Sequence, residues 1–382
     1  MRTFDRSFAS WADEKPTDLP DEPVRKTLRL RYTAPFSYAT LAMLNSVQTL
    51  RALAAWLVVL HHYMQLAHNF TLTDPVSTAL HMYGAIGVDL FFIISGFVIY
   101  ISAAEKQVTP ATFAVHRLAR IAPAYWIFTL ATAAALLVSP SFVPLTQFEP
   151  LFLLKSLLFI PAQNPSGIGA YPLITVGWTL NYEMAFYGIF LLSFYGPKTA
   201  RPALIALGLF LLCKLVPHLG GDFAFYDNPI IYEFLFGILI AIAHQKGWVK
   251  KIPPLMAIAL VVIALGLIIH NGQVEHKPMK SGFPCALILL AAVSLERFFS
   301  RRAFMAKLGD WSYSTYLCHV LVISAMTRLH QWINLNDVVT FTLIAITILA
   351  VSYTSFTFIE KPISKLAKRN FRGSMPAPAS AA

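Results

Sequence analysis

The segment Leu44–Met64, LNSVQTLRALAAWLVVLHHYM, places one arginine and two adjacent histidines in an otherwise apolar run of helix-forming residues. On an α-helix, Arg51 and His62 are eleven steps of about 100° apart, so they share one face and lie about 16 Å apart along the axis. His61 lies about 80° to the side of that line. Ionisable groups in a bilayer are costly and usually face a cavity or a partner. We therefore predict a functional membrane helix here, if the rest of the chain is a membrane protein.

The composition is that of a membrane protein. Of the 382 residues, 57% are hydrophobic and 13% are charged, which is far from an ordinary soluble domain. Apolar runs long enough to cross a bilayer recur along the chain. We predict an all-α, polytopic membrane helix bundle of about ten transmembrane helices. The expected spans are 47–67, 81–102, 122–139, 178–195, 203–219, 229–245, 254–270, 282–298, 309–329 and 338–359.

The basic residues predict the orientation of this bundle. With the N-terminus in the cytoplasm, 24 of the 30 Lys and Arg residues fall on the cytoplasmic side of the predicted spans. This asymmetry agrees with the positive-inside rule and places both termini inside. The net charge of +11 therefore needs no nucleic-acid partner. The three cysteines lie in predicted spans without metal-ligand spacing and are expected to be buried small hydrophobes.

The expected organisation is one membrane domain between two cytoplasmic tails. Residues 1–46 form a polar, largely disordered tail whose basic cluster at 25–31 anchors the topology or contacts lipid. No apolar segment near Met1 indicates a cleaved signal peptide. The membrane domain covers 47–362, with Pro362 expected to end its last helix. A second tail covers 363–382, and its small Pro/Ala-rich residues at 374–382 are expected to be disordered.

Three acidic residues lie at least four residues inside the predicted spans. Asp89, in GVDLFFIISGFVIY, lies about two turns inside the second span, and Glu183, in WTLNYEMAFYGIF, lies over a turn inside the fourth. Such carboxylates are expensive unless they are paired or hydrogen-bonded. Structural pairing and a direct role at a reaction centre remain open for both, and for Glu233. Ser95 and Gly96 are predicted to be close-packing residues.

Basic and titratable residues occur at two further places. Arg117 and Arg120, in FAVHRLARIAPAYW, are three residues apart and point the same way on a helix. Two guanidinium groups suit phosphate oxygens, although from spacing alone positive-inside anchoring is the simpler interpretation. Pro123 is expected to begin the third span. His319 lies about halfway across the ninth, where a lone histidine is more often a packing or hydrogen-bonding residue than a catalyst.

The longest outer connection is 140–177. It contains FEPLFLLKSLLFI, which is too short to span and is interrupted by Lys155. We predict a re-entrant or interfacial helix that covers a pocket. Trp178 and Tyr182 follow it at a depth where an aromatic interface belt is the simplest interpretation.

Six segments in the same order resemble the motifs of acyltransferase family 3, a family of integral membrane acyltransferases, and in particular of its exopolysaccharide O-acetyltransferase branch. The likeness covers roughly residues 44–365, and the six motifs together are highly specific. The matches are Arg51 and His62 to the family's Arg-x10-His first helix; Asp89 to the acidic position of its second helix; Arg117, Arg120, Pro123, Tyr125 and Trp126 to Arg-x-x-Arg-x-x-Pro-x-Tyr-Trp; Glu183 to Trp-Ser-Leu-x-x-Glu-x-x-Phe-Tyr; His319 to Tyr-Ser-x-Tyr-Leu-x-His; and Glu360, Lys361 and Pro362 to a closing Glu-Lys-Pro.

The resemblance implies an enzyme of the bacterial inner membrane that moves an acyl group from cytoplasmic acyl-CoA to a carbohydrate hydroxyl. The donor is commonly acetyl-CoA, with succinyl-CoA as an alternative, and no metal is implied. The acceptor is an exopolysaccharide, capsule, O-antigen unit or glycosylated metabolite, with a lipid-linked form included. His62 is the expected base, which either deprotonates the hydroxyl directly or accepts the acyl group first. Arg51 is expected to hold the donor or to stabilise the oxyanion.

The remaining site residues are assigned by the same resemblance. Asp89 and Glu183 are expected to complete the catalytic centre. Arg117 and Arg120, with Arg51, Tyr125 and Trp126, are expected to bind the coenzyme. Trp178, Tyr182 and His319 are expected to contact the acceptor. His116 stands where many members have a further arginine, and Thr179 replaces the commoner serine.

Two other functions account for part of the sequence. A proton-coupled secondary transporter of small carboxylates explains the buried His, Asp and Glu residues equally well. The chain lacks internal repeats and the paired Gly/Pro-broken helices that such carriers often have. A structural subunit for polymer export explains the buried charges poorly. No appended hydrolase-like domain is present, so any acyl relay is expected to finish in the membrane domain or on another protein.

Overall fold

A computed structural model describes residues 44–104, 108–143, 145–299 and 303–372. Within these ranges the regular structure is entirely helical, as predicted, and no strand is present. The basic cluster at 25–31, with the rest of residues 1–43, and the tail residues 373–382 therefore lie outside the described residues. The helices are α2 (Asn45–His68), α3 (Pro75–Tyr83), α4 (Ile86–Ala103), α5 (Pro110–Val138), α6 (Pro150–Leu157), α7 (Trp178–Leu192), α8 (Arg201–Lys214), α9 (Glu233–Gln245), α10 (Pro254–Asn271), α11 (Phe283–Ser294), α12 (Glu296–Phe299), α13 (Ala303–Ile333), α14 (Asp337–Ser355) and α15 (Lys361–Arg372).

Each of the ten predicted spans overlaps at least one helix, but the helices differ in length and polarity. Five helical segments of the described residues are long and apolar enough to cross a membrane, namely Ile86–Ala103, Pro110–Val138, Lys198–Leu219, Pro254–Asn271 and Asp337–Asn370. α2 and α13 have 24 and 31 residues, yet their polar and titratable side chains keep them out of this set. The structure thus supports a helical membrane protein, while ten crossings and the sidedness of the termini stay predictions.

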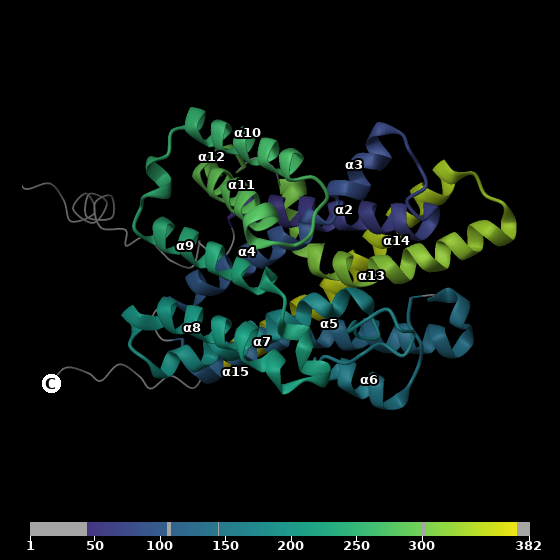
Figure 1. Cartoon of the computed structure of the whole chain (residues 1–382), viewed down its shortest axis with the longest axis horizontal. Helices are drawn as coiled ribbons and strands as arrows, with labels where there is room; N and C mark the ends of the chain where they lie inside the picture. Colours follow the sequence, from purple (N-terminus) through teal and green to yellow (C-terminus); the bar gives the residue numbers. More distant parts are fainter. Residues whose placement is uncertain (1–43, 105–107, 144, 300–302, 373–382) are drawn as a thin grey trace, which may run out of the picture. The chain divides into compact units, whose positions relative to one another are not determined.

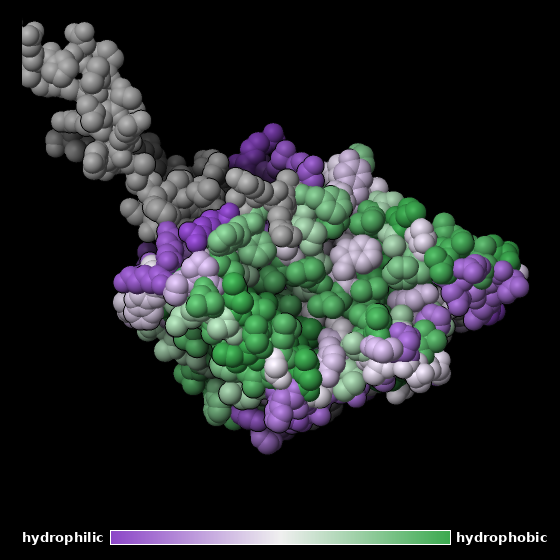
Figure 2. Space-filling view, turned by 90° about the horizontal axis from the view of Figure 1, so that it is seen from above, coloured by the Kyte–Doolittle hydropathy of each residue, from purple (hydrophilic) through white to green (hydrophobic). Residues whose placement is uncertain are grey.

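Apolar side chains cover much of the outside. Figure 2 shows one face on which a broad apolar field is bordered by hydrophilic residues. α8 and α10 contribute strongly to this exterior, because only 17% of the most apolar window of each is buried. The corresponding window of α4 is 72% buried, so α4 lies inside the bundle. An apolar exterior of this extent is what a lipid environment requires.

Three predicted helix boundaries were wrong. The span 81–102 is interrupted, since α3 ends at Tyr83 and α4 begins at Ile86. Gly84 lies at this break, and a Cβ atom there would lie 2.9 Å from His61 Cβ of α2. The absence of a side chain therefore lets the chain after α3 approach α2 closely. Pro123 lies inside α5, which begins at Pro110 after its Thr109 cap. Neighbouring helices often allow a membrane helix to continue through a proline.

The last boundary concerns the C-terminal end of the membrane domain. Pro362 was expected to end the final helix, yet α15 continues from Lys361 to Arg372. A wide π-helical turn, Phe356–Glu360, precedes this proline. Pro362 has no N–H to donate, and we infer that the altered bonding of the π turn allows the helix to pass it.

α2 packs mainly against α13 and α4 (Figure 1) and also contacts α3, α11 and α12. Two glycines permit this close approach. A side-chain carbon at Gly309 of α13 would lie 2.0 Å from the Gln48 carbonyl oxygen, and one at Gly87 of α4 would lie 2.2 Å from that of Ala54. Gly96 of α4 packs in the same way against the Phe234 carbonyl of α9, which confirms its predicted packing role.

Candidate active site

The histidine end of α2 contains a direct imidazole pair. His62 Nδ1 lies 3.2 Å from His319 Nε2 and 3.0 Å from the Val58 carbonyl oxygen. His319 is fully buried on α13, with its Nδ1 2.7 Å from the Tyr316 carbonyl oxygen. The lone histidine of the ninth predicted span therefore has a hydrogen-bonding role, as the sequence allowed, and one of its partners is the predicted base.

These contacts determine the tautomers of both rings. A carbonyl oxygen only accepts, so the Nδ1 atoms of His62 and His319 each carry a hydrogen. A neutral His319 then has its Nε2 lone pair directed at the His62 Nδ1–H. The lone pair of neutral His62 consequently lies on Nε2, the ring nitrogen on the far side from these contacts. This is the tautomer that a histidine needs to act as a base or nucleophile through Nε2.

His61 supports the same region without taking part in the pair. Its Nδ1 lies 3.1 Å from the Leu80 carbonyl oxygen of α3. Its ring contacts that of His62 edge-on, with centroids 5.5 Å apart, and also contacts Phe70. His61 therefore ties α3 to α2 beside the candidate base.

The arginine end of α2 lies in a charged network. Arg51 Nη1 donates to Gln48 Oε1 over 3.2 Å, and Gln48 Nε2 donates in turn to Asp310 of α13. Arg51 is also within electrostatic range of Arg120, Glu360, Asp310 and Glu183. The three carboxylates stabilise two neighbouring guanidinium groups that would otherwise repel each other.

Arg117 and Arg120 lie on α5, which begins before the predicted third span and includes them. Arg117 Nη2 donates to Ser102 Oγ over 2.5 Å, and its guanidinium lies 5.5 Å from the Phe113 ring centroid. Arg120 is within electrostatic range of Arg51. The structure therefore places Arg51 and Arg120 in one network with Asp310, Glu360 and Glu183, and Arg117 lies on the same helix as Arg120. Guanidinium groups suit phosphate oxygens, while the three carboxylates offset the positive charge of this network.

Glu183 lies in this network and is held by two hydroxyl groups. Its Oε1 accepts hydrogen bonds from Ser95 Oγ over 3.0 Å and from Tyr187 Oη over 2.6 Å. Ser95, which the sequence assigned to packing, is thus a hydrogen-bond donor to a candidate catalytic residue. No described contact joins Glu183 to His62. Glu183 instead lies within electrostatic range of Arg51.

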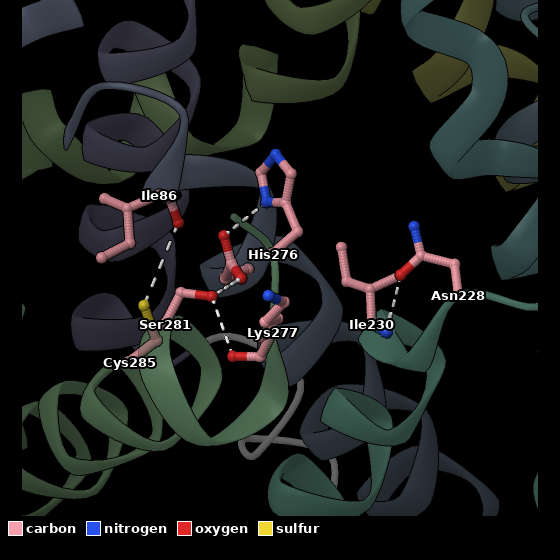
Figure 3. Close-up of polar contacts among 8 residues, drawn as sticks. Ile86, Asn228, Ile230, His276, Lys277, Ser281 and Cys285 are labelled. Carbon is pink, nitrogen blue, oxygen red and sulfur yellow. Dashed lines mark hydrogen bonds and ion pairs between the residues drawn. The ribbon is translucent and has the colours of Figure 1, made fainter. Parts of the chain in front are cut away.

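Asp89 lies in a different polar cluster. Its Oδ2 is 2.8 Å from His276 Nδ1, and its Oδ1 accepts from Ser281 Oγ over 2.5 Å (Figure 3). Its side chain is fully buried, as is that of Glu233, which lies close enough to interact with it. Asp89 therefore orients His276, and no described contact joins it to His62.

The predicted aromatic site residues separate into two groups. Tyr125 donates to the Ser156 carbonyl oxygen over 3.0 Å, and Trp126 to that of Leu157 over 2.8 Å, so both fasten α6 to α5. These contacts give the two residues a structural function, and no described contact brings them to the arginines. Trp178 instead lies beside His276, with ring centroids 5.9 Å apart.

Tyr182 lies one turn after Trp178 on α7. Its ring stacks on Phe225 with centroids 4.4 Å apart, and its hydroxyl donates to the Phe225 carbonyl oxygen. Tyr182 is 1% exposed, and its ring contacts that of Trp178 edge-on, with centroids 5.9 Å apart. Contact of Tyr182 with an acceptor is not supported by this placement.

Comparison with known proteins identifies the family. The profile described as an acyltransferase domain matches residues 44–357. The chain belongs to acyltransferase family 3. This membership makes it a transferase and confirms the resemblance seen in its motifs. No solved structure matches the chain.

Named relatives extend this comparison. The acyltransferase is 31% identical over 317 residues to the exopolysaccharide production protein ExoZ of Rhizobium meliloti (strain 1021), covering 80% of this chain and 94% of that protein. It is 27% identical to the acyltransferase MdmB of Streptomyces mycarofaciens, covering 85% and 93% of the two chains. It is also 27% identical to the putative membrane-bound transacylase BcsY of Komagataeibacter xylinus, covering 72% of each.

Several residues of the site were not identified from the sequence. Gln48 and Asp310 complete the Arg51 network, and His276 and Ser281 complete the Asp89 cluster. Gln48 lies one helical turn before Arg51, and this spacing is a signal that was available. The others come from segments at least 187 residues away from their partners, and no local pattern indicates such contacts.

Proposed function

We propose that this membrane acyltransferase moves a short acyl group, acetyl in the first instance, from cytoplasmic acyl-CoA to a hydroxyl of a surface polysaccharide. The family supports acyl transfer, and the names of ExoZ and the transacylase BcsY support a polysaccharide acceptor and a membrane setting. The donor and the bacterial inner membrane are expectations from the family resemblance.

The observation that carries the proposal is the placement of two functions on one helix. α2 holds Arg51 in the network of arginines and carboxylates and His62 in the imidazole pair, about 16 Å apart along its axis. The extended pantetheine arm of a coenzyme suits such a separation between a phosphate site and a reacting carbon.

The residues assign the steps as follows. Arg120 and Arg117 hold the CoA phosphates, and Arg51 attracts the donor toward α2. The Nε2 lone pair of His62 either takes the proton of the acceptor hydroxyl or attacks the thioester carbon first. In the first route the hydroxyl oxygen bonds to the thioester carbon as His62 takes its proton, the carbon–sulfur bond breaks, and the departing CoA thiolate receives the proton from His62. In the second route His62 Nε2 bonds to the thioester carbon and CoA leaves as the thiolate; the acceptor hydroxyl then attacks the acyl carbon, the carbon–nitrogen bond breaks, and the hydroxyl proton passes to the thiolate. His62 carries positive charge during both routes. His319 Nε2 stabilises that charge through the His62 Nδ1–H.

Purified protein in liposomes tests this function. With acetyl-CoA and de-O-acylated surface polysaccharide, the wild type should release CoA and transfer labelled acetyl to the polymer. His62→Ala should lower transfer by about 10²- to 10⁴-fold, the usual contribution of a general base. His68→Ala, on the last turn of the same helix, is the control and should keep its activity. Full turnover by His62→Ala would contradict the assignment of the base, and inactive wild-type protein would contradict the donor or the acceptor.

A further inference from the structure

His276 belongs to none of the six sequence motifs, yet a buried carboxylate fixes its orientation. Asp89 Oδ2 lies 2.8 Å from its Nδ1, and the hydroxyl of Ser281 donates to the other carboxylate oxygen (Figure 3). The Asp89 side chain is fully buried, while that of His276 is 23% exposed. A carboxylate only accepts, so His276 donates from Nδ1 and its Nε2 is directed away from Asp89. The buried Asp89 carboxylate therefore holds the His276 ring with its Nε2 pointing away from the cluster.

The backbone at His276 is strained and firmly held. Its φ is +53°, in the left-handed region that non-glycine residues rarely adopt. On one side, Val274 N donates to the Met82 carbonyl oxygen of α3 over 3.0 Å. On the other, Ser281 N donates to the Lys277 carbonyl oxygen over 2.9 Å. Such strain persists where the surroundings over-determine a conformation, and it is concentrated at functional sites.

The charged residues near His276 in the same loop pair with one another and not with Asp89. Lys277 and Lys280 lie 2.6 and 3.4 Å from the Glu275 carboxylate, and their hydrogen bonds lower the pKa of Glu275. The lysines therefore do not compete with His276 for Asp89. His276 remains the residue through which the buried Asp89 acts on the surroundings.

The neighbours of His276 are those of a sugar site. The Trp178 ring lies 5.9 Å from the His276 ring, and Tyr171 approaches Trp178 from another side with centroids 6.5 Å apart. His276 is also within electrostatic range of His61, the residue next to the candidate base. An indole provides a broad apolar face for the C–H side of a sugar ring, and an oriented imidazole recognises a hydroxyl.

We infer that Trp178 and the Asp89–His276 pair form a subsite for the acceptor sugar, in which His276 Nε2 hydrogen-bonds one hydroxyl while another hydroxyl of the sugar faces His62. The inference rests on the proposed function and deepens it, because it assigns acceptor recognition to residues separate from the donor's arginines. A hydroxyl both donates and accepts, so it satisfies Nε2 whether the ring is neutral or charged. His276 is a positioning residue in this arrangement.

His276→Asn is the sharpest test. Asparagine tolerates the left-handed backbone and its amide can still donate to Asp89, but it lacks the second ring nitrogen. The matched control is His270→Asn, an exposed histidine at the end of α10. Both variants are purified into liposomes. Acetyl transfer is measured at increasing concentrations of surface polysaccharide, which is purified from a strain whose gene for this protein is deleted. Acetyl-CoA hydrolysis is measured in the absence of polysaccharide.

The expected result separates acceptor from donor. His276→Asn should raise KM for the polysaccharide about tenfold, as for the loss of one hydrogen bond, and leave kcat and acetyl-CoA hydrolysis within about threefold of wild type. Trp178→Phe should raise the same KM, and His270→Asn should change nothing. An unchanged polysaccharide KM in His276→Asn would overturn the inference, as would an equal loss of transfer and hydrolysis. If wild-type protein transfers no acetyl at all, the proposed function fails instead.

Discussion

The contact between His319 and His62 gives the most direct test of the site. His319→Leu removes the acceptor that lies 3.2 Å from His62 Nδ1, while the Val58 carbonyl at 3.0 Å remains. The His62 ring should therefore keep its place on α2 and its tautomer. What it loses is the second partner for its Nδ1–H at the moment when the ring becomes positively charged.

The expected size of the effect follows from this difference. A hydrogen bond between neutral groups contributes about 0.5–1.5 kcal/mol, whereas one to a charged group contributes about 1.5–3 kcal/mol. Because the bond already exists with neutral rings in the ground state, only its strengthening in the transition state, about 1–1.5 kcal/mol, affects kcat, and this corresponds to about a 5- to 12-fold loss. KM for acyl-CoA should change little, since His319 is not in the arginine network.

The assay is acyl transfer in liposomes with acetyl-CoA and de-O-acylated polysaccharide. His319→Gln is measured in parallel, because its amide oxygen can accept from the His62 Nδ1–H and should restore part of the rate. His330→Leu is the matched control, since this residue lies on the same helix and contacts Thr340 instead.

One result would refute this reasoning. If His319→Leu turns over at the wild-type rate, the imidazole pair does not stabilise the reacting state. The same conclusion would follow if His319→Leu and His330→Leu lost equal activity, because the loss would then reflect general damage to α13.

Two further perturbations address the donor site and the packing. Arg117→Ala or Arg120→Ala should raise KM for acyl-CoA about 10- to 100-fold, because each removes charge-assisted hydrogen bonds to the donor. CoA release measures this KM, and an unchanged KM in both variants would show that the two arginines do not bind the donor. Gly309→Ala should lower the free energy of unfolding by about 1–3 kcal/mol, because its new carbon would lie 2.0 Å from the Gln48 carbonyl oxygen. Gly266→Ala has open space and is the control in the same thermal-unfolding assay; equal stability of the two variants would contradict the close approach of α13 to α2.

The sequence by itself determined the class of the protein, its helical content and much of its chemistry. Apolar runs about 20 residues long are a local property, and each predicted span overlaps at least one helix. The shared face of Arg51 and His62 also follows from helical periodicity alone, since α2 is continuous from Asn45 to His68. The order of the motifs was sufficient to indicate the family, which the comparison confirmed.

Only the tertiary structure decided which candidate residues meet. His319 lies 257 residues from His62, and His276 lies 187 residues from Asp89, so neither contact is encoded in a local pattern. The same packing places Asp89 beside His276 and Glu183 within electrostatic range of Arg51. It also brings Tyr125 and Trp126 into hydrogen-bond contact with α6. The physical reason is that a buried polar group must find a partner on another helix, and the packing of those helices determines which one it finds.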